Sequence, residues 1–186
     1  SYADTDPKLG GLHLNYYGCV TALDRAVGKL RARLRKHCIA ENTLVAFCSD
    51  NGPEGSERDP GRQGDFKGRK RSLYEGGVRV PSLLEWPARI KPGTSSEVAT
   101  CAVDYFPTIL EAVGVRMPDD RPLDGISLIP LFDGVMQTRP SPLGFHIRGQ
   151  AAWHDGDWKA YCSKVNTHEW ELYNLKDDQM LNLSLN

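Results

Sequence analysis

Two adjacent oxygen donors, Asp50 and Asn51, directly follow a short apolar run at residues 43–48. The length and β-branched content of that run predict a buried strand, and ligands in α/β proteins collect just beyond the carboxyl ends of strands. A carboxylate beside an amide carbonyl suits a hard cation such as Ca²⁺ or Mg²⁺, and Ca²⁺ takes about 6 to 8 oxygen ligands. The pair therefore indicates part of a metal site that further ligands must complete. The alternative is an ordinary turn, which Asp-Asn-Gly also forms.

Lys70 stands between Arg69 and Arg71, in a glycine-bearing loop that can fold back toward the same strand end. Positive charge beside a divalent cation suits sulfate or phosphate oxygens, so Lys70 is a candidate substrate contact. The alternative is a solvated basic loop. The histidines show no paired metal-ligand spacing, and the sequence lacks the nucleophile elbow, the zinc-protease motif and the glycine-rich phosphate loops.

Regular elements on both sides of these residues must position them. Apolar residues recur at spacings of three and four over residues 15–36, which predicts a helix with one apolar face and a solvated basic face. This helix and the strand at 43–48 indicate half of a parallel α/β unit. Pro81 confines a further strand, at residues 78–86, to an edge or a bulge.

The later part of the chain changes character. Asp104 is predicted to cap a helix that Gly114 ends. Beyond it, short apolar segments alternate with glycine turns over residues 145–161, and residues 170–173 add one more strand. The pattern predicts a small antiparallel sheet packed on the α/β body.

Composition excludes several classes of protein. The 186 residues carry 23 Lys and Arg against 24 Asp and Glu, a net charge of −1, which argues against a nucleic-acid binder that works through bulk charge. No apolar run approaches the roughly 20 residues of a membrane helix. The chain starts at Ser1 without the features of a signal peptide, which indicates processing or a piece of something longer. The five cysteines lack zinc-ligand spacing and are expected to be mostly buried thiols.

Several motifs, taken in order, resemble the sulfatase family. They lie at residues 17–24, 42–54, 70–81, 103–108, 123–128, 155–159 and 171–175. The resemblance covers nearly the whole chain, and its most specific part is the separation of Asp-Asn-Gly from Glu-Gly-Gly-x-Arg. The branch that it resembles most is that of the arylsulfatases and N-acetylgalactosamine-6-sulfatases.

The resemblance implies roles for particular residues. Asp50 and Asn51 match the family's late Ca²⁺ ligands, with Mg²⁺ the second choice, and Lys70 matches the lysine that contacts the sulfate ester. Arg79, after the double glycine, is expected to be a structural anchor held by hydrogen bonds or an ion pair. The implied substrate is a sulfate ester, either an aryl sulfate or a sulfated sugar.

The resemblance also implies the architecture: part of an alkaline-phosphatase-like α/β fold. Residues 1–140 are expected to form the C-terminal part of the α/β sulfatase body, and residues 141–186 a small antiparallel β subdomain. The expected partner is the N-terminal portion of the same enzyme. Members of the family generally act outside the cytoplasm, in the periplasm, the lysosome or the medium.

The sequence departs from the family at the nucleophile. Sulfatases use a formylglycine made from the Cys or Ser of a C/S-x-P-x-R motif, and no Cys or Ser here has that context. Because covalent catalysis needs an activated nucleophile, the chain alone is expected to be inactive. Two alternatives remain: a phosphoester or phosphonate hydrolase of the alkaline phosphatase superfamily, and a non-catalytic remnant or sulfated-glycan binding module.

Overall fold

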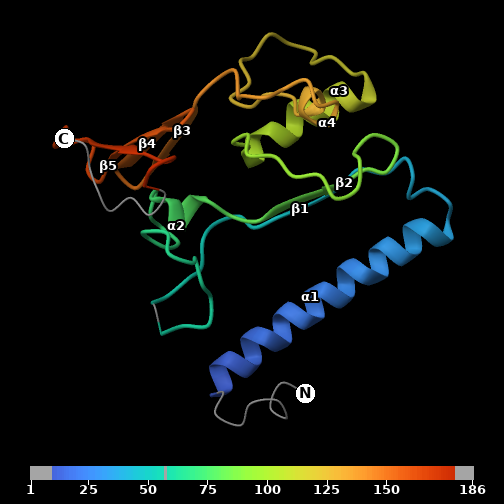
Figure 1. The fold of residues 1–186 in the computed structure, drawn as a ribbon, viewed down its shortest axis with the longest axis horizontal. Helices are drawn as coiled ribbons and strands as arrows, with labels where there is room; N and C mark the ends of the chain where they lie inside the picture. Colours follow the sequence, from blue (N-terminus) through green and yellow to red (C-terminus); the bar gives the residue numbers. More distant parts are fainter. Residues whose placement is uncertain (1–9, 57, 179–186) are drawn as a thin grey trace.

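The computed structural model describes residues 10–56 and 58–178. A two-stranded ribbon lies between one long helix and two shorter ones, and a four-stranded sheet stands beside it (Figure 1). The elements in chain order are α1 (Gly11–Lys36), β1 (Val45–Cys48), α2 (Glu75–Val78), β2 (Ser82–Glu85), the 3-10 helix η2 (Ala102–Asp104), α3 (Tyr105–Val113), α4 (Ile129–Phe132), β3 (Leu143–Ile147), β4 (Gln150–Asp155), β5 (Trp158–Cys162) and β6 (Glu171–Asn174).

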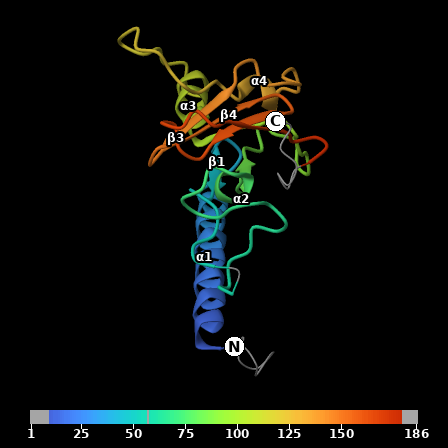
Figure 2. The ribbon, with the colours of Figure 1, turned by 90° about the vertical axis from the view of Figure 1, so that its left-hand side faces the viewer.

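The predicted first helix is confirmed and begins four residues earlier than expected, at Gly11. It forms an outer layer, with the other elements on one side of it (Figures 1 and 2). Its basic residues are exposed as predicted, and Arg31 also forms a two-pronged hydrogen bond to Glu85 of β2 at 2.6 and 2.8 Å. None of its residues is buried, because the apolar stripe borders an open groove of about 600 Å³ against the ribbon.

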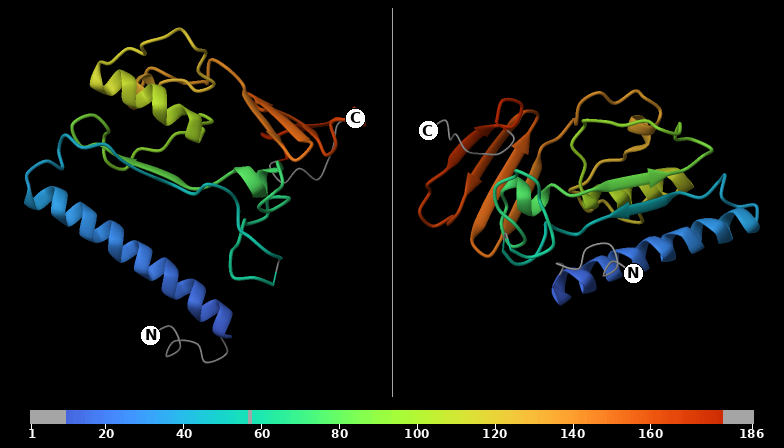
Figure 3. Two further views of the ribbon diagram at one scale, coloured as in Figure 1. Left: turned by 180° about the vertical axis from the view of Figure 1, so that it is seen from behind. Right: turned by 60° about the horizontal axis from the view of Figure 1, so that its bottom comes forward.

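The two faces of the ribbon face different helices, as expected for strands between helical layers. Val45 and Phe47 of β1 line the groove shared with α1. The alternate residue, Ala46, lines a cavity of about 470 Å³ shared with α3 and α4. Figure 3 shows the resulting order of helix, ribbon and helices from behind and from below. The α/β layering implied by the sequence is therefore present.

The sequence predicts that β1 belongs to half of a parallel α/β unit, and within residues 10–56 and 58–178 its one strand partner, β2, is antiparallel. β1 pairs with β2 in the antiparallel sense, with Val45 opposite Glu85 and Cys48 opposite Ser82. A parallel neighbour requires a crossover connection that returns the chain to the starting end of the sheet. The connection between these strands instead contains a loop and the four-residue α2, so the chain runs back along β1. β2 begins directly after Pro81, where a missing amide hydrogen removes no ladder bond.

The predicted helix near residue 104 is confirmed, but the predicted cap is wrong. α3 ends at Gly114, whose φ of 66° is left-handed, as expected for a glycine stop. Asp104 makes no side-chain cap to α3. Its carboxylate instead accepts hydrogen bonds from the Cys101 amide at 2.7 Å and from the Arg139 guanidinium at 2.7 and 2.9 Å. Asp104 is fully buried, so the cation from a distant segment compensates its charge better than a helix terminus would.

The C-terminal antiparallel sheet is confirmed, in the order β3-β4-β5-β6. The β4–β5 turn falls at Gly156, whose φ is positive at 56°. The sheet covers one compact apolar cluster, to which the loop before α2 contributes Leu73. The cluster consists of Leu73, Ala152, Tyr161, Tyr173 and Leu175.

The expectation of mostly buried cysteines is wrong. Cys19 and Cys38 are exposed, Cys48 and Cys101 are half-buried, and Cys162 alone is fully buried. All five are free thiols. Within the described residues, no helix is both long and apolar enough to cross a membrane.

Candidate functional site

A cavity of about 550 Å³ opens where the end of β1 meets the loop before α2 and the β3–β4 hairpin. Asp50, Asn51 and Lys70 all line it. The structure therefore brings together all three residues that the sequence singled out. A volume of this size lies within the range of about 300 to 1,000 Å³ typical of small-molecule sites.

The two candidate metal ligands sit in a tight turn. The Ser49 amide donates to the Pro81 carbonyl at 3.2 Å, which holds the start of the turn against the segment that leads into β2. The Ser49 hydroxyl donates to the Asn51 carbonyl at 2.9 Å, and Asn51 Nδ2 donates to the Gly52 carbonyl at 2.9 Å. The amide oxygen of Asn51 is thereby left as an acceptor. Asp50 is exposed, and its carboxylate has no hydrogen bond or ion pair with any residue that the structure describes.

The chemistry of this donor pair fits a hard cation, whereas the number of donors falls short. Ca²⁺ takes about 6 to 8 oxygens, and one carboxylate with one amide supplies only a few of them. Among residues 10–56 and 58–178, no three His, Cys, Asp or Glu side chains are grouped closely enough to hold a metal. Asp50 and Asn51 can thus bind Ca²⁺ firmly only if further ligands join them.

Glycine contacts press this turn against α2. The Gly52 amide donates to the Gly77 carbonyl at 2.8 Å, and a Cβ on Gly52 would lie 1.8 Å from the Gly76 carbonyl oxygen. The Gly76 amide donates in turn to the Lys67 carbonyl at 2.8 Å. No side chain fits between segments this close, so the Asp-Asn-Gly and Glu-Gly-Gly motifs are two halves of one backbone contact.

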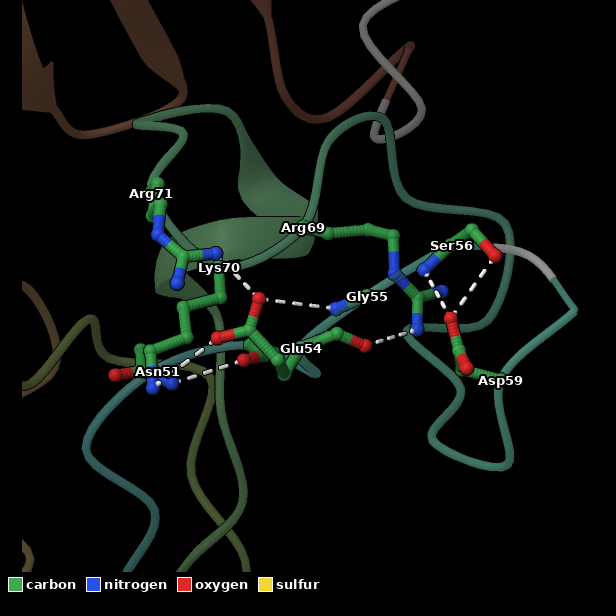
Figure 4. Close-up of polar contacts among 9 residues, drawn as sticks. Asn51, Glu54, Gly55, Ser56, Asp59, Arg69, Lys70 and Arg71 are labelled. Atoms are coloured by element: carbon green, nitrogen blue, oxygen red, sulfur yellow. Dashed lines mark hydrogen bonds and ion pairs between the residues drawn. The ribbon is translucent and has the colours of Figure 1, made fainter. Parts of the chain in front are cut away.

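Lys70 reaches the same turn from the loop. Its amide donates to the Pro53 carbonyl at 3.1 Å, and its ammonium lies 3.6 Å from Glu54 Oε2. Figure 4 shows the side chain extending toward Asn51. The Arg71 guanidinium also binds Glu54. The hydrogen bond from Arg71 lowers the pKa of Glu54, so this carboxylate stays ionised and holds both cations at the rim of the cavity.

A third cation braces the loop from behind. Arg69 donates to the carbonyls of Glu54 and Gly61 at 3.0 and 2.9 Å. Further along, Asp59 accepts from the Ser56 amide at 2.5 Å and from its hydroxyl at 2.9 Å, and these bonds lower the Asp59 pKa (Figure 4). Arg69 points away from the cavity and acts on the backbone, in contrast to Lys70 beside it.

An ion pair fastens α2 to the C-terminal sheet. Lys159 of β5 donates from Nζ to Glu75 Oε1 at 2.6 Å, with side-chain exposures of 1% and 7%. Burial lowers the pKa of Lys159, and the Glu75 carboxylate opposes that shift. Arg79 lies 3.9 Å from the other Glu75 oxygen and 4.9 Å from the centre of the Phe66 ring. Arg79 thus makes the anchoring contacts expected from the sequence.

An aromatic cluster fastens the loop to the sheet a second time. The Tyr74 hydroxyl donates to the Glu171 carboxylate at 3.0 Å, and its ring centre lies 3.9 Å from that of Tyr161. The ammonium of Lys67 lies 4.3 Å from the Tyr74 ring centre and 3.3 Å from the Tyr173 hydroxyl. Burial, more than any other cause, raises the pKa of Tyr74 and Tyr173, so both hydroxyls remain donors.

The C-terminal sheet provides a wall of the cavity that was not predicted from the sequence. His146, Ile147 and Arg148, at the end of β3, line it together with Phe145. The sequence predicts a hairpin here, and none of its residues was a candidate for the site. The available signal was the Arg148-Gly149 pair, because a basic residue at a two-residue hairpin turn projects from the sheet.

Comparison with known proteins identifies the family to which this chain is similar. The Sulfatase family model matches residues 2–115, and the model for the N-sulphoglucosamine sulphohydrolase C-terminal region matches residues 61–184. Steryl-sulfatase of Mus musculus is 38% identical over 175 residues, which cover 87% of this chain and 28% of that protein. N-acetylgalactosamine-6-sulfatase of Canis lupus familiaris is 36% identical over 171 residues, 89% of this chain and 32% of that protein.

Solved structures agree in fold. The crystal structure of Ps i-CgsB in complex with k-i-k-neocarrahexaose superimposes with a TM-score of 0.84 and 32% identity, covering 98% of this chain and 41% of that one. A protein solved with its substrate D-glucosamine-2-N,6-O-disulfate gives a TM-score of 0.70 and 26% identity, covering 87% of this chain and 33% of that one.

The chain belongs to the sulfatase family, and its fold is part of the alkaline-phosphatase-like fold of these enzymes. It spans less than a third of the length of the steryl-sulfatases it matches.

Proposed function

We propose that this chain supplies a metal-binding turn and a sulfate contact to an enzyme that hydrolyses sulfuric esters. Asp50 and Asn51 hold Ca²⁺, and Lys70 contacts the sulfate group. The observation that carries the proposal is their convergence on one cavity, in a chain whose family is established. Each residue has a free or rim-exposed polar group there, as a site for an anionic ester requires.

The chemistry available to these residues is binding and charge neutralisation. The Lys70 ammonium can pair with a sulfate oxygen once the ester competes with Glu54 for it. A bound Ca²⁺ would add positive charge that orients and polarises the sulfate oxygens. The Gly52 contact holds the turn so that Asp50 and Asn51 stay in register with Lys70. None of these groups is a nucleophile, so the chain alone binds a sulfate ester weakly and turns it over negligibly.

The remainder of the enzyme is the proposed partner. None of the α1 residues is buried, and large apolar side chains of this helix and the ribbon are exposed. Further strands and helices would cover them, because exposed apolar faces of this extent are costly in water. We propose that an N-terminal sulfatase portion provides this cover together with the nucleophile. By family resemblance, the complete enzyme acts outside the cytoplasm.

The proposed substrates are an aryl sulfate or a sulfated sugar. One structural neighbour was solved with a glucosamine disulfate as its substrate, and one relative is named for a 6-sulfated N-acetylgalactosamine. Both names support a sulfated sugar for this chain.

The test replaces Lys70 in a complete sulfatase that carries this chain. For Lys70→Ala we expect kcat/KM for an aryl sulfate to fall by about 100-fold, comparable to the loss of one transition-state donor, with the melting temperature unchanged. Lys29→Ala, an exposed lysine of α1, serves as the matched control and should keep full activity. Survival of activity within a few-fold in Lys70→Ala would show that Lys70 does not contact the sulfate.

A second measurement tests the role of the chain alone. The pure 186-residue chain should show no Ca²⁺-dependent hydrolysis of an aryl sulfate. Turnover by this chain that disappears in Asp50→Ala would overturn the proposal that it lacks the nucleophile.

A further inference from the structure

The tip of the β3–β4 hairpin is a rigid two-residue turn at the edge of the cavity. Ile147 and Gln150 form the last pair of the ladder, so Arg148 and Gly149 make up the turn. Their φ angles are 50° and 79°, the left-handed pair of a type I′ hairpin. The Val165 amide donates to the Gly149 carbonyl at 2.8 Å and ties the turn to the segment after β5. Arg148 therefore projects from a fixed backbone.

The cationic side chains around this cavity differ in whether they have an ion-pair partner. Lys70 and Arg71 are both held by Glu54. Arg148 is exposed, and its guanidinium forms no hydrogen bond or ion pair with the residues described in 10–56 and 58–178. The two-residue turn requires the left-handed backbone conformation of Arg148. No polar contact within the described residues calls for an arginine side chain at this position.

One cation in the cavity lining has no anionic partner among the described residues. Three cationic side chains line the cavity, Lys70, Arg71 and Arg148, and Glu54 at the rim pairs with the first two. The carboxylate of Asp50 also lines the cavity. A sulfate monoester carries one negative charge, which Lys70 can match. An aryl or steroid leaving group would bring no charge for Arg148. A leaving group with an anion of its own would bring one.

We infer that Arg148, at the β3–β4 turn, is a subsite for a second anionic group on the substrate, which makes the ligand of this cavity a sulfated oligosaccharide with a further sulfate or a carboxylate. The planar guanidinium can bind either oxyanion through two parallel hydrogen bonds. Ile147, which is 43% exposed beside it, offers an apolar surface for the face of a sugar ring. This inference rests on the proposed function.

The test is a chemical-shift titration of the ¹⁵N-labelled 186-residue chain in the presence of Ca²⁺. The probes are N-acetylgalactosamine 6-sulfate with one anion, a 6-sulfated chondroitin disaccharide that adds a carboxylate, and glucosamine 2-N,6-O-disulfate that adds a sulfate. The variant is Arg148→Asn, because asparagine tolerates the left-handed backbone and removes the charge. Arg116→Ala, an exposed arginine outside the cavity, is the control.

We expect Arg148→Asn to lower the affinity for at least one two-anion probe by about fivefold or more, as for the loss of a partly solvated ion pair. The affinity for the one-anion probe should fall by less than about twofold. The affected probe identifies the second anion as carboxylate or sulfate. Equal effects on all three probes, or no effect on either two-anion probe, would overturn the inference. Lys70→Ala separates the two proposals: if it leaves the one-anion probe unaffected, the proposed function itself fails. Absence of binding by every probe would contradict both.

Discussion

Lys159 of β5 donates a 2.6 Å hydrogen bond to Glu75 of α2, and both side chains are buried although 84 residues separate them. Glu75 begins the helical turn whose backbone carries Gly76 and Gly77. Those glycines touch Gly52, next to the candidate metal ligands. The C-terminal sheet is thereby joined to the turn of Asp50 and Asn51 through one ion pair and one backbone contact. The sheet positions the site as well as lining it.

Removal of one partner of this ion pair should destabilise the chain strongly. In Lys159→Met the buried Glu75 carboxylate loses its hydrogen-bonded cation and keeps only Arg79 at 3.9 Å, so we expect a cost toward the lower end of about 3 to 5 kcal/mol. Urea denaturation followed by circular dichroism measures the free energy of unfolding. Lys164→Met, at an exposed lysine after β5, should change that free energy by less than about 0.5 kcal/mol. A similarly small loss for Lys159→Met would show that the pair is not buried in solution.

Gly52→Ala should separate the two halves of the backbone contact. Its Cβ would lie 1.8 Å from the Gly76 carbonyl oxygen, a clash that only backbone movement can relieve. Overpacking of this kind costs about 1 to 3 kcal/mol, so the melting temperature should drop. Gly28→Ala on α1, where a Cβ would meet nothing within 4 Å, should instead raise it slightly. Equal melting temperatures for the two variants would be inconsistent with the described contact.

The protein should lose stability on mild acidification through His154. Burial is the main cause that lowers the pKa of His154 below 6.5, with Lys159 and Arg79 adding to it and Glu75 opposing it. The unfolded chain therefore binds a proton at higher pH than the folded chain. The stabilisation is complete above the ordinary histidine pKa of about 6.5 and is lost as the pH falls through the lower folded value.

Unfolding titrations between neutral and acidic pH test this prediction. The slope of stability against pH in that window should flatten in His154→Gln. It should remain in His146→Gln, which changes an exposed histidine. An unchanged slope in His154→Gln would assign the effect to other groups.

Asp50 should dominate the response of the chain to Ca²⁺. Addition of Ca²⁺ should shift the amide resonances of Asp50 and Asn51, because these carry the two available oxygen donors. Asp50→Asn removes the charged ligand and should weaken binding by about tenfold or more, since ligand charge sets Ca²⁺ affinity. Asp65→Asn, at an exposed aspartate in the loop, should bind as the wild type does. Equal affinity in the two variants would contradict the proposed ligand.

Local chemistry predicted most of the elements. The spacing of Val20, Leu23 and Val27 predicts α1, and Gly114 predicts the end of α3, because helix periodicity and left-handed stops depend on residues within a few positions. The hairpins of the C-terminal sheet follow from glycine turns between alternating apolar residues. The candidate residues Asp50, Asn51 and Lys70 were singled out from residue type and place relative to a strand, and their expected roles as Ca²⁺ ligands and sulfate contact follow from the family resemblance.

The sequence by itself therefore determined the two longer helices, the hairpins and the residue types of the site, because each depends on near neighbours. The short helices α2 and α4 were not predicted, since a four-residue turn leaves no periodic pattern. The direction of β1 against β2, the partner of Asp104 and the meeting of Lys159 with Glu75 were decided only by the tertiary structure. The same holds for the place of Arg148 in the cavity wall. These relationships join segments tens of residues apart, and burial selects among many possible partners the one that satisfies a charge or a backbone group.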